Sequence, residues 1–122
     1  MKKILIAEDN PSNFKLFQMQ LRDMDVELLH AENGIEAIKI CEDNSDICLV
    51  LMDIQMPLMN GEDAAIRIKE IYPDMPIISQ TAYSYCGNVS DENKKYFAEF
   101  IMKPIDMKYL KVLINKYCFD EN

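Results

Sequence analysis

Residues 48–53 read CLVLMD, a run of five apolar residues that ends in an aspartate. A continuous apolar run of this length is typical of a strand that is buried on both faces of a parallel sheet. A second run, ILIA at residues 4–7, is followed in the same way by Glu8 and Asp9. If the two strands are parallel neighbours, Asp53 and these two acids lie together at one edge of the sheet.

Outward from these two runs, short apolar segments alternate with amphipathic ones along the chain. We expect strands at residues 3–7, 27–31, 48–52, 76–81 and 100–102, and helices at residues 11–24, 33–42, 62–72, 90–98 and 107–117. This alternation predicts an α/β fold, in which a single doubly wound parallel sheet of five strands is covered on both faces by five helices. Ligands of such sheets bind beyond the carboxyl ends of the strands.

The first and last expected helices each present one apolar face. Apolar side chains recur at steps of three and four residues, namely Phe14, Phe17, Leu21 and Met24 in the first helix and Leu110, Leu113, Ile114 and Tyr117 in the last. Asn33 with Glu36, and Asp106, lie where N-cap residues belong, which supports the starts of two helices. We interpret the apolar residues as core.

The composition favours one acidic globular domain over residues 1–122. The 13 basic and 21 acidic residues give a net charge of −8, which disfavours direct binding to nucleic acid or to an anionic membrane surface. No apolar run approaches the roughly 20 residues that span a bilayer, and the N-terminus does not resemble a signal peptide. We therefore expect no membrane insertion and a cytoplasmic location.

The four cysteines, Cys41, Cys48, Cys86 and Cys118, are spread along the chain without a C-x-x-C pair, and His30 is the single histidine. This pattern does not indicate a zinc site, and we interpret all four cysteines as buried or incidental thiols. The nine methionines are interpreted as core residues.

The acids at the strand ends require a counter-charge. Glu8, Asp9 and Asp53 would repel one another, and close carboxylates raise each other's pKa values unless a cation is bound. A few oxygen ligands with room for water favour Mg²⁺. Each acid alone also fits an N-cap role, but three acids at strand ends favour a metal site. Thr81 and Lys103, at the ends of the fourth and fifth strands, add a hydroxyl and an ammonium, which suits phosphoryl transfer to a carboxylate.

Four segments together resemble the receiver domains of bacterial response regulators and hybrid histidine kinases: ILIAED (4–9), LMDIQMPLMNG (51–61), QTAY (80–83) and KPID (103–106). The resemblance covers essentially the whole chain. It implies a flavodoxin-like sheet of order 2-1-3-4-5 and a Mg²⁺-dependent phosphoacceptor of a two-component phosphorelay. The second segment is similar to receivers of hybrid sensor histidine kinases, so we expect a receiver excised from such a kinase rather than a stand-alone regulator.

The resemblance also assigns roles to individual residues. It implies that Asp53 takes a phosphoryl group from a phosphohistidine. Mg²⁺ would be bound by Glu8, Asp9, Asp53 and the backbone carbonyl of Gln55. The phosphoryl oxygens would be held by Thr81, Lys103 and the backbone N–H of Ala82.

Further implied features concern the response to phosphorylation. Thr81 and Phe100 match the conformational switch of the family. Gln55 and Tyr83 match positions that modulate hydrolysis of the phosphoaspartate, and we expect the bulk of Tyr83 to slow it. The family also has a cis peptide before the proline that matches Pro104.

The implied partners are a histidine kinase or a histidine phosphotransfer domain. The implied protein is not an enzyme with a separate substrate but a phosphoacceptor that promotes its own phosphotransfer and dephosphorylation. The fourth helix, fifth strand and fifth helix form a candidate homodimer surface. Lys95 and Tyr96 stand where many receivers have Ala-Gly, so the family does not define the loop that follows or the usual output surface.

Three other interpretations stay open. A flavodoxin-like electron carrier would need a first loop that cradles phosphate, whereas EDNPSN (8–13) begins with two carboxylates. A phosphatase of the haloacid dehalogenase type also uses an Asp nucleophile and Mg²⁺, but it has a second Asp where this chain has Gln55. A receiver-shaped interaction module would not use phosphorylation, and the presence of all five polar site residues argues against it.

Overall fold

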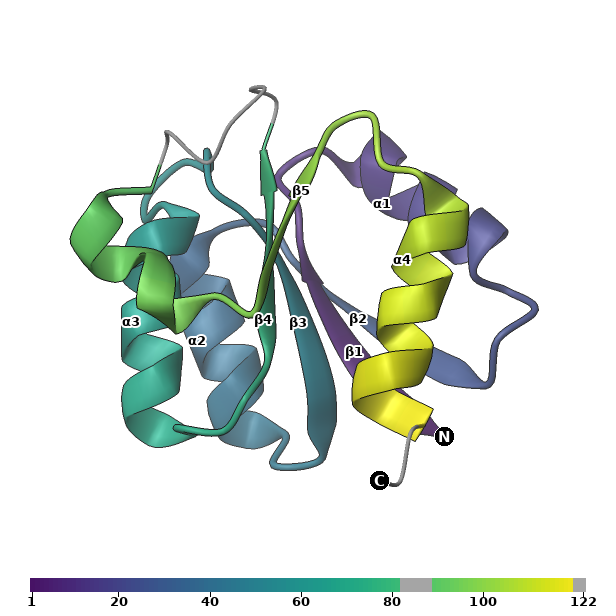
Figure 1. Ribbon diagram of the computed structural model, residues 1–122, viewed down its shortest axis with the longest axis horizontal. Coiled ribbons are helices and arrows are strands. Elements are labelled where there is room, and N and C mark those ends of the chain that lie inside the picture. Colours follow the sequence, from purple (N-terminus) through teal and green to yellow (C-terminus); the bar gives the residue numbers. More distant parts are fainter. Residues whose placement is uncertain (82–88, 120–122) are drawn as a thin grey trace.

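Figure 1 shows a central sheet with helices on both faces. The computed structural model describes residues 1–81 and 89–119. The strands are β1 (Lys2–Ala7), β2 (Val26–Ala31), β3 (Ile47–Asp53), β4 (Ile77–Thr81) and β5 (Glu99–Met102). All neighbouring strands are parallel, and their order is β2-β1-β3-β4-β5. The predicted doubly wound topology is therefore confirmed.

The helical connections are α1 (Pro11–Gln20), α2 (Gly34–Asp43), α3 (Gly61–Ile71), the 3₁₀ helix η1 (Asp91–Tyr96), and α4 (Met107–Ile114), which continues into the π-helical segment η2 (Asn115–Phe119). In Figure 1, α1 and α4 lie on one side of the sheet, and α2, α3 and η1 lie on the other. Within residues 1–81 and 89–119, no helix has the length and apolarity needed to cross a membrane.

Besides the last helix, which changes to a π-helix after Ile114, two helices differ from the prediction in detail. α1 ends at Gln20 rather than at Met24, because Leu21 leaves the helical conformation (ψ 7°) while its N–H still donates to the carbonyl of Phe17. The side chain of Met24 nevertheless packs against the core. The helix expected at residues 90–98 is the six-residue η1, and the side chain of Ser90 forms no cap hydrogen bond at its start. The shorter, tighter helix is consistent with its lack of buried residues.

Polar side chains cap the starts of the four α-helices. Asn10, Asn33, Asn60 and Asp106 each accept a hydrogen bond from a backbone N–H of the first turn. The caps expected at residues 33 and 106 are therefore confirmed. Asn10 and Asn60 begin the helices that follow β1 and β3, so these caps also fix where the chain leaves the edge of the sheet that carries the acids.

Alternation along the strands divides the core into two layers. The layer toward α1 and α4 contains Ile4, Ile6, Leu49, Leu51, Ile78 and Ile101. The layer toward α2 and α3 contains Leu5, Ala7, Val50, Met52 and Ile77. Of the expected helical core residues, Phe17, Leu21, Leu110, Leu113 and Ile114 are buried, and Phe14, Met24 and Tyr117 pack partly buried against them.

Cys48 and Cys118 form a disulfide, so the expectation that all four cysteines are thiols is wrong for this pair. The segment α4–η2 runs back along the sheet and brings Cys118 to the start of β3, with the two Cα atoms 5.4 Å apart. Cys41 is buried and free, and burial raises the pKa of its thiol to about 12. Cys86 lies outside the described residues.

Candidate functional site

The three expected carboxylates meet at the carboxyl edge of the sheet. Ala7 of β1 is the register neighbour of Met52 of β3, so the acids that follow the two strands are adjacent. One carboxylate oxygen from each of Glu8, Asp9 and Asp53 lies within 4.8 Å of the others. Glu8 and Asp53 are buried, whereas Asp9 is exposed. A cation bound here would thus have hard oxygen ligands on the protein side and access to water on the other.

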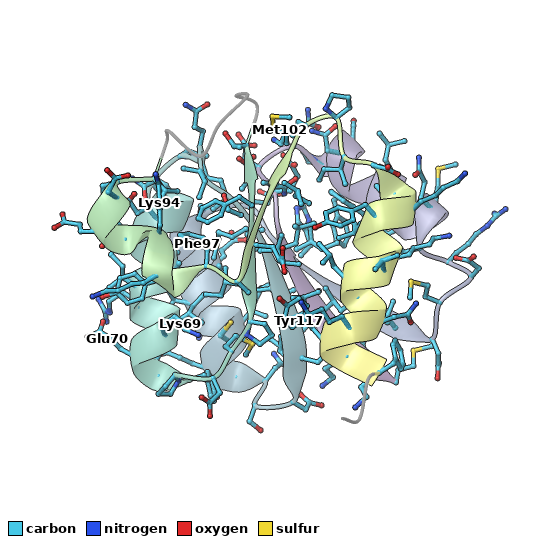
Figure 2. All side chains as sticks on the ribbon, viewed as in Figure 1. Lys69, Glu70, Lys94, Phe97, Met102 and Tyr117 are labelled. Atoms are coloured by element: carbon cyan, nitrogen blue, oxygen red, sulfur yellow. A yellow bond between two sulfur atoms is a disulfide. The ribbon has the colours of Figure 1, made fainter. Side chains whose placement is uncertain are left out.

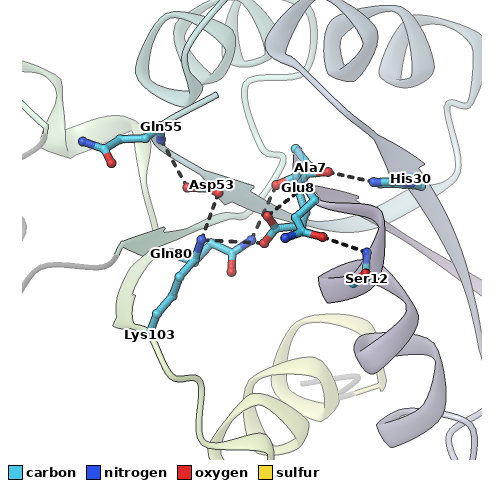
Figure 3. Close-up of polar contacts among 9 residues, drawn as sticks. Ala7, Glu8, Ser12, His30, Asp53, Gln55, Gln80 and Lys103 are labelled. Carbon is cyan, nitrogen blue, oxygen red and sulfur yellow. Dashed lines mark hydrogen bonds and ion pairs between the residues drawn. The ribbon is translucent and has the colours of Figure 1, made fainter. Parts of the chain in front are cut away.

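The carboxylate of Asp53 is oriented by hydrogen bonds on both oxygens. Oδ1 accepts the N–H of Gln55 at 3.2 Å, and Oδ2 accepts from Nζ of Lys103 at 3.0 Å (Figure 3). The backbone that follows Asp53 is held against the start of α3, because the N–H of Gly61 donates to the carbonyl of Ile54 at 2.9 Å. A Cβ on Gly61 would collide with the carbonyl oxygen of Asp53, so only glycine lets α3 begin this close to β3.

Glu8 is an acid held inside the protein, with only 2% of its surface exposed. Its Oε1 lies 3.7 Å from Nζ of Lys103, and its Oε2 accepts the N–H of Asn10 at 3.3 Å. Burial raises the pKa of Glu8; Lys103 opposes this shift, and the nearby charge of Asp53 adds to it. The net result is a raised pKa, because the cost of burying the carboxylate outweighs its interactions with Lys103 and Asn10.

Lys103 bridges two of the acids. Burial by itself lowers the pKa of the Lys103 ammonium, but the hydrogen bond to Asp53 and the charges of Asp53, Glu8 and Asp9 outweigh it, so the pKa is raised. Lys103 is therefore a firmly held cation among the carboxylates. The Lys103–Pro104 peptide bond is cis, as the family resemblance implied.

His30, at the penultimate position of β2, contacts the backbone of the site. Its Nε2 lies 2.7 Å from the carbonyl oxygen of Glu8 (Figure 3), and its ring stacks on Phe14 of α1 with centroids 4.1 Å apart. Residue spacing does not connect this lone histidine with the acids, because the contact depends on β2 pairing with β1. His30 thus joins β2 and α1 to the strand end that carries Glu8.

Gln80 is a second residue that sequence reasoning missed. It is fully buried and is the register neighbour of Asp53 in β4. The available signal was a long amide in IISQT (77–81), a segment that begins with two isoleucines and whose residues are all buried. A buried amide beside the expected nucleophile needs a physical reason.

The remaining expected site residues lie around this cluster. Thr81 ends β4 and is buried. Phe100 of β5 is half-buried, with its ring centroid 5.5 Å from that of Phe97, which follows η1 and is labelled in Figure 2. Ala82 and Tyr83 lie outside the described residues, and the switch and hydrolysis roles stay predictions.

A cavity of about 540 Å³ opens beside the acids. It is lined by Asp9, Ile54, Gln55, Met56, Pro57 and Asn60. Of the three acids, Asp9 borders this cavity. The acids and the ammonium of Lys103 together suit the binding of a cation and a phosphoryl group.

Comparison with known proteins agrees with this arrangement. The profile of the response regulator receiver domain family matches residues 4–115. The chain is 42% identical over 81 residues to the autoinducer 1 sensor kinase/phosphatase LuxN of Vibrio harveyi, covering 66% of this chain and 9% of LuxN. It is 31% identical over 122 residues to the hybrid signal transduction histidine kinase I of Dictyostelium discoideum, covering 93% of this chain and 7% of that kinase. The chain therefore spans less than a tenth of either relative.

The fold is shared with solved receiver structures. The response regulator TrrA of Thermotoga maritima in complex with Mg²⁺–BeF superposes with a TM-score of 0.85 at 33% identity, covering 96% of this chain and 99% of TrrA. TrrA in complex with the histidine kinase ThkA gives the same TM-score and identity, covering 97% and 99%. From the family profile and the shared fold, the chain belongs to the response regulator receiver domain family of two-component systems.

Proposed function

We propose that Asp53 accepts a phosphoryl group from a phosphohistidine in a Mg²⁺-dependent reaction. The observation that carries the proposal is the grouping of three carboxylates within 4.8 Å of one another around Lys103, whose Nζ lies 3.0 Å from Oδ2 of Asp53. Glu8, Asp9 and Asp53, with the backbone carbonyl of Gln55, would hold Mg²⁺, and their hard oxygen atoms fit this ion.

Each residue of the site has a distinct role in the proposed transfer. A carboxylate oxygen of Asp53 attacks phosphorus, the bond from phosphorus to the imidazole nitrogen breaks, and the imidazole leaves with the electron pair. Lys103 and the hydroxyl of Thr81, with the backbone N–H of Ala82, stabilise the negative charge on the phosphoryl oxygens. Bound Mg²⁺ supplies further neutralisation of the same charge.

The proposed response and partners extend from this site. Thr81 and Phe100 would switch conformation after phosphorylation, and Gln55 and Tyr83 would set the rate of hydrolysis. A histidine kinase or a histidine phosphotransfer domain is the proposed partner, which is supported by the complex of the similar regulator TrrA with ThkA. For any homodimer we propose the surface of η1, β5 and α4, which exposes Met102 (Figure 2) and Val112.

The test is incubation with acetyl phosphate and Mg²⁺, followed by intact mass spectrometry. We expect one added phosphoryl group, lost in Asp53→Asn and in the presence of EDTA. Asp63→Asn, which alters an exposed acid in the first turn of α3, is the matched control and should be modified like the wild type. A wild-type chain that gains no phosphoryl group, or an Asp53→Asn variant that still gains one, would contradict the proposal.

A further inference from the structure

Gln80 shares one row of the sheet with Asp53 but has no role in the chemistry described above. The register joins Asp53 to Gln80, and Gln80 to Ile101 of β5. Register neighbours point to the same face of a sheet, and Ile101 belongs to the core layer toward α1 and α4. The side chain of Gln80 therefore lies on this face, beside Asp53, and is 0% exposed.

The amide of Gln80 is only half satisfied. Its Nε2 donates to the carbonyl oxygen of Ala7 at 3.5 Å, a long contact. Its Oε1 has no hydrogen-bond partner among the described residues. A buried acceptor without a partner destabilises the folded state, so packing alone would favour an apolar side chain here. The amide oxygen is thus available to a donor that reaches it in another state of the site.

A cavity joins this amide to the charged residues. The cavity has a volume of about 310 Å³ and is lined by Glu8, Gln80 and Lys103 together with side chains of α1 and of the segment that leads into α4. Figure 3 shows these three side chains grouped at the carboxyl edge of the sheet. The ammonium of Lys103 and the amide of Gln80 therefore border the same space.

The ammonium of Lys103 holds oxygens that a metal ion also needs. Its Nζ lies 3.0 Å from Oδ2 of Asp53 and 3.7 Å from Oε1 of Glu8. A divalent cation bound by these carboxylates repels Lys103 and takes its acceptors. An ammonium carries three N–H donors and needs new acceptors when it moves in a partly buried site.

We propose that Gln80 is a positioning residue for Lys103, whose ammonium donates a hydrogen bond to Oε1 of Gln80, directly or through one water, when Mg²⁺ occupies the acids. The inference rests on the proposed function, because it takes Glu8, Asp9 and Asp53 as the Mg²⁺ ligands. A neutral amide suits this role because it accepts from the ammonium without adding a fourth negative charge to the site.

The first test replaces Gln80 by methionine, an apolar side chain of similar length. We expect the Kd for Mg²⁺, measured by calorimetric titration, to rise by about threefold or more. The midpoint of thermal unfolding in EDTA should stay equal or rise, because the acceptor without a partner is gone. Weaker metal binding in an equally stable protein is a result that general structural damage does not produce.

Ser79→Ala is the matched control. Oγ of Ser79 is also buried without a hydrogen-bond partner among the described residues, and it lies one position earlier in the same strand. Its register neighbours Met52 and Phe100 belong to the opposite layer of the core, toward α2 and α3. We expect this substitution to leave the Kd for Mg²⁺ unchanged.

A double-mutant cycle tests whether Gln80 acts through Lys103. In a Lys103→Gln background, Gln80→Met should no longer change the Kd for Mg²⁺. An equal effect in both backgrounds, an unchanged Kd in Gln80→Met, or an equal loss in Ser79→Ala would overturn the inference. If Lys103→Gln does not fold, the comparison of Gln80→Met with Ser79→Ala still decides. Absence of Mg²⁺ binding by the wild type would instead overturn the proposed function.

Discussion

The two faces of the sheet are packed differently. Toward α2 and α3, small residues let the elements approach closely, and the fully buried positions include Ala37, Ala64 and Ala65. A Cβ on Gly34 would lie 2.7 Å from the carbonyl oxygen of Met59, and one on Gly61 would collide with that of Asp53. On this face, called the packed face below, the starts of α2 and α3 therefore lie in direct contact with the backbone of neighbouring segments.

Toward α1 and α4, the same strands end in a polar row beside a cavity of about 310 Å³, and the row contains Glu8, Asp53, Gln80 and Lys103. Alternation thus gives β3 a tightly held backbone on one face and a reactive side chain on the other. The packed face thus fixes the position of Asp53, while the open face leaves room for its chemistry.

The Cys48–Cys118 disulfide attaches the end of α4–η2 to the open face of the sheet. Reduction should lower the free energy of unfolding by about 3 kcal/mol, because a crosslink between residues far apart in sequence restricts the unfolded chain. The two cysteines are separated by 70 residues. Urea denaturation with and without dithiothreitol measures the difference.

Two variants serve as controls for this measurement. Cys118→Ser should unfold at the same urea concentration whether or not dithiothreitol is present. Cys41→Ala changes the free thiol of the packed face and should keep the full response to reduction. A response that persists in Cys118→Ser would mean that reduction acts elsewhere.

On the packed face, Gly61→Ala should lower the free energy of unfolding by about 2 kcal/mol, because the added methyl group forces α3 away from Asp53. It should also slow phosphorylation by acetyl phosphate, since the backbone behind the acceptor moves. Arg67→Ala, at an exposed position of the same helix, is the control and should change neither quantity appreciably. Equal stability of the wild type and Gly61→Ala would show that the contact at Gly61 is not tight.

On the open face, Glu8→Gln should raise the free energy of unfolding at pH 7 by about 1 kcal/mol when measured in EDTA. The pKa of Glu8 is raised in the folded protein, chiefly by burial, so the folded state binds the proton more tightly than the unfolded state. Stability contributed by protonated Glu8 is complete below the unfolded pKa and is lost as the pH rises through the folded one.

The gain from Glu8→Gln should therefore disappear near pH 4, and urea denaturation at both pH values measures this. The control Glu42→Gln, at an exposed position of α2, should change the free energy of unfolding only slightly, and by the same amount at pH 7 and near pH 4. A pH-independent gain in Glu8→Gln would contradict the assignment of the effect to a buried charge.

In the loop between β3 and α3, we expect a smaller change in stability, at Leu58. Leu58 has a positive φ of 67° and is 82% exposed, so its side chain neither fits the backbone conformation nor packs. Leu58→Gly should raise the free energy of unfolding by about 0.5 kcal/mol, the net of relieved strain and added chain entropy. Leu58→Ala keeps the Cβ and should give no gain; a gain of equal size there would trace the effect to the exposed side chain.

The parallel sheet and the position of the polar residues at its carboxyl edge could be predicted from local patterns, because alternation of apolar and amphipathic segments predicts parallel strands whose carboxyl ends share one edge. The strand order 2-1-3-4-5 was implied only by the resemblance to receiver domains. The helix expected at residues 90–98 was less predictable, since DENKKY at residues 91–96 has no apolar stripe to fix its length.

Gln80 and the disulfide could not be predicted for a different reason. Whether the Gln80 amide finds partners depends on three other strands and on the cavity above them. Pairing of Cys48 with Cys118 depends on where a C-terminal helix ends relative to the start of β3. Both are tertiary properties, and neither residue spacing nor composition carries a signal for them.

The asparagine caps of α2 and α3 also bear on how the protein ages chemically. Asn33 and Asn60 each precede a glycine, the pair in which the glycine nitrogen most readily attacks the asparagine side chain and releases ammonia. In the fold, each side chain accepts a hydrogen bond from its helix, and the nitrogens of Gly34 and Gly61 donate to carbonyl groups elsewhere. Deamidation therefore requires local opening at these helix starts. The rate at which the stored protein gains negative charge by deamidation therefore measures how often these helix starts open. At Asn60, it reports opening of the backbone that packs against Asp53.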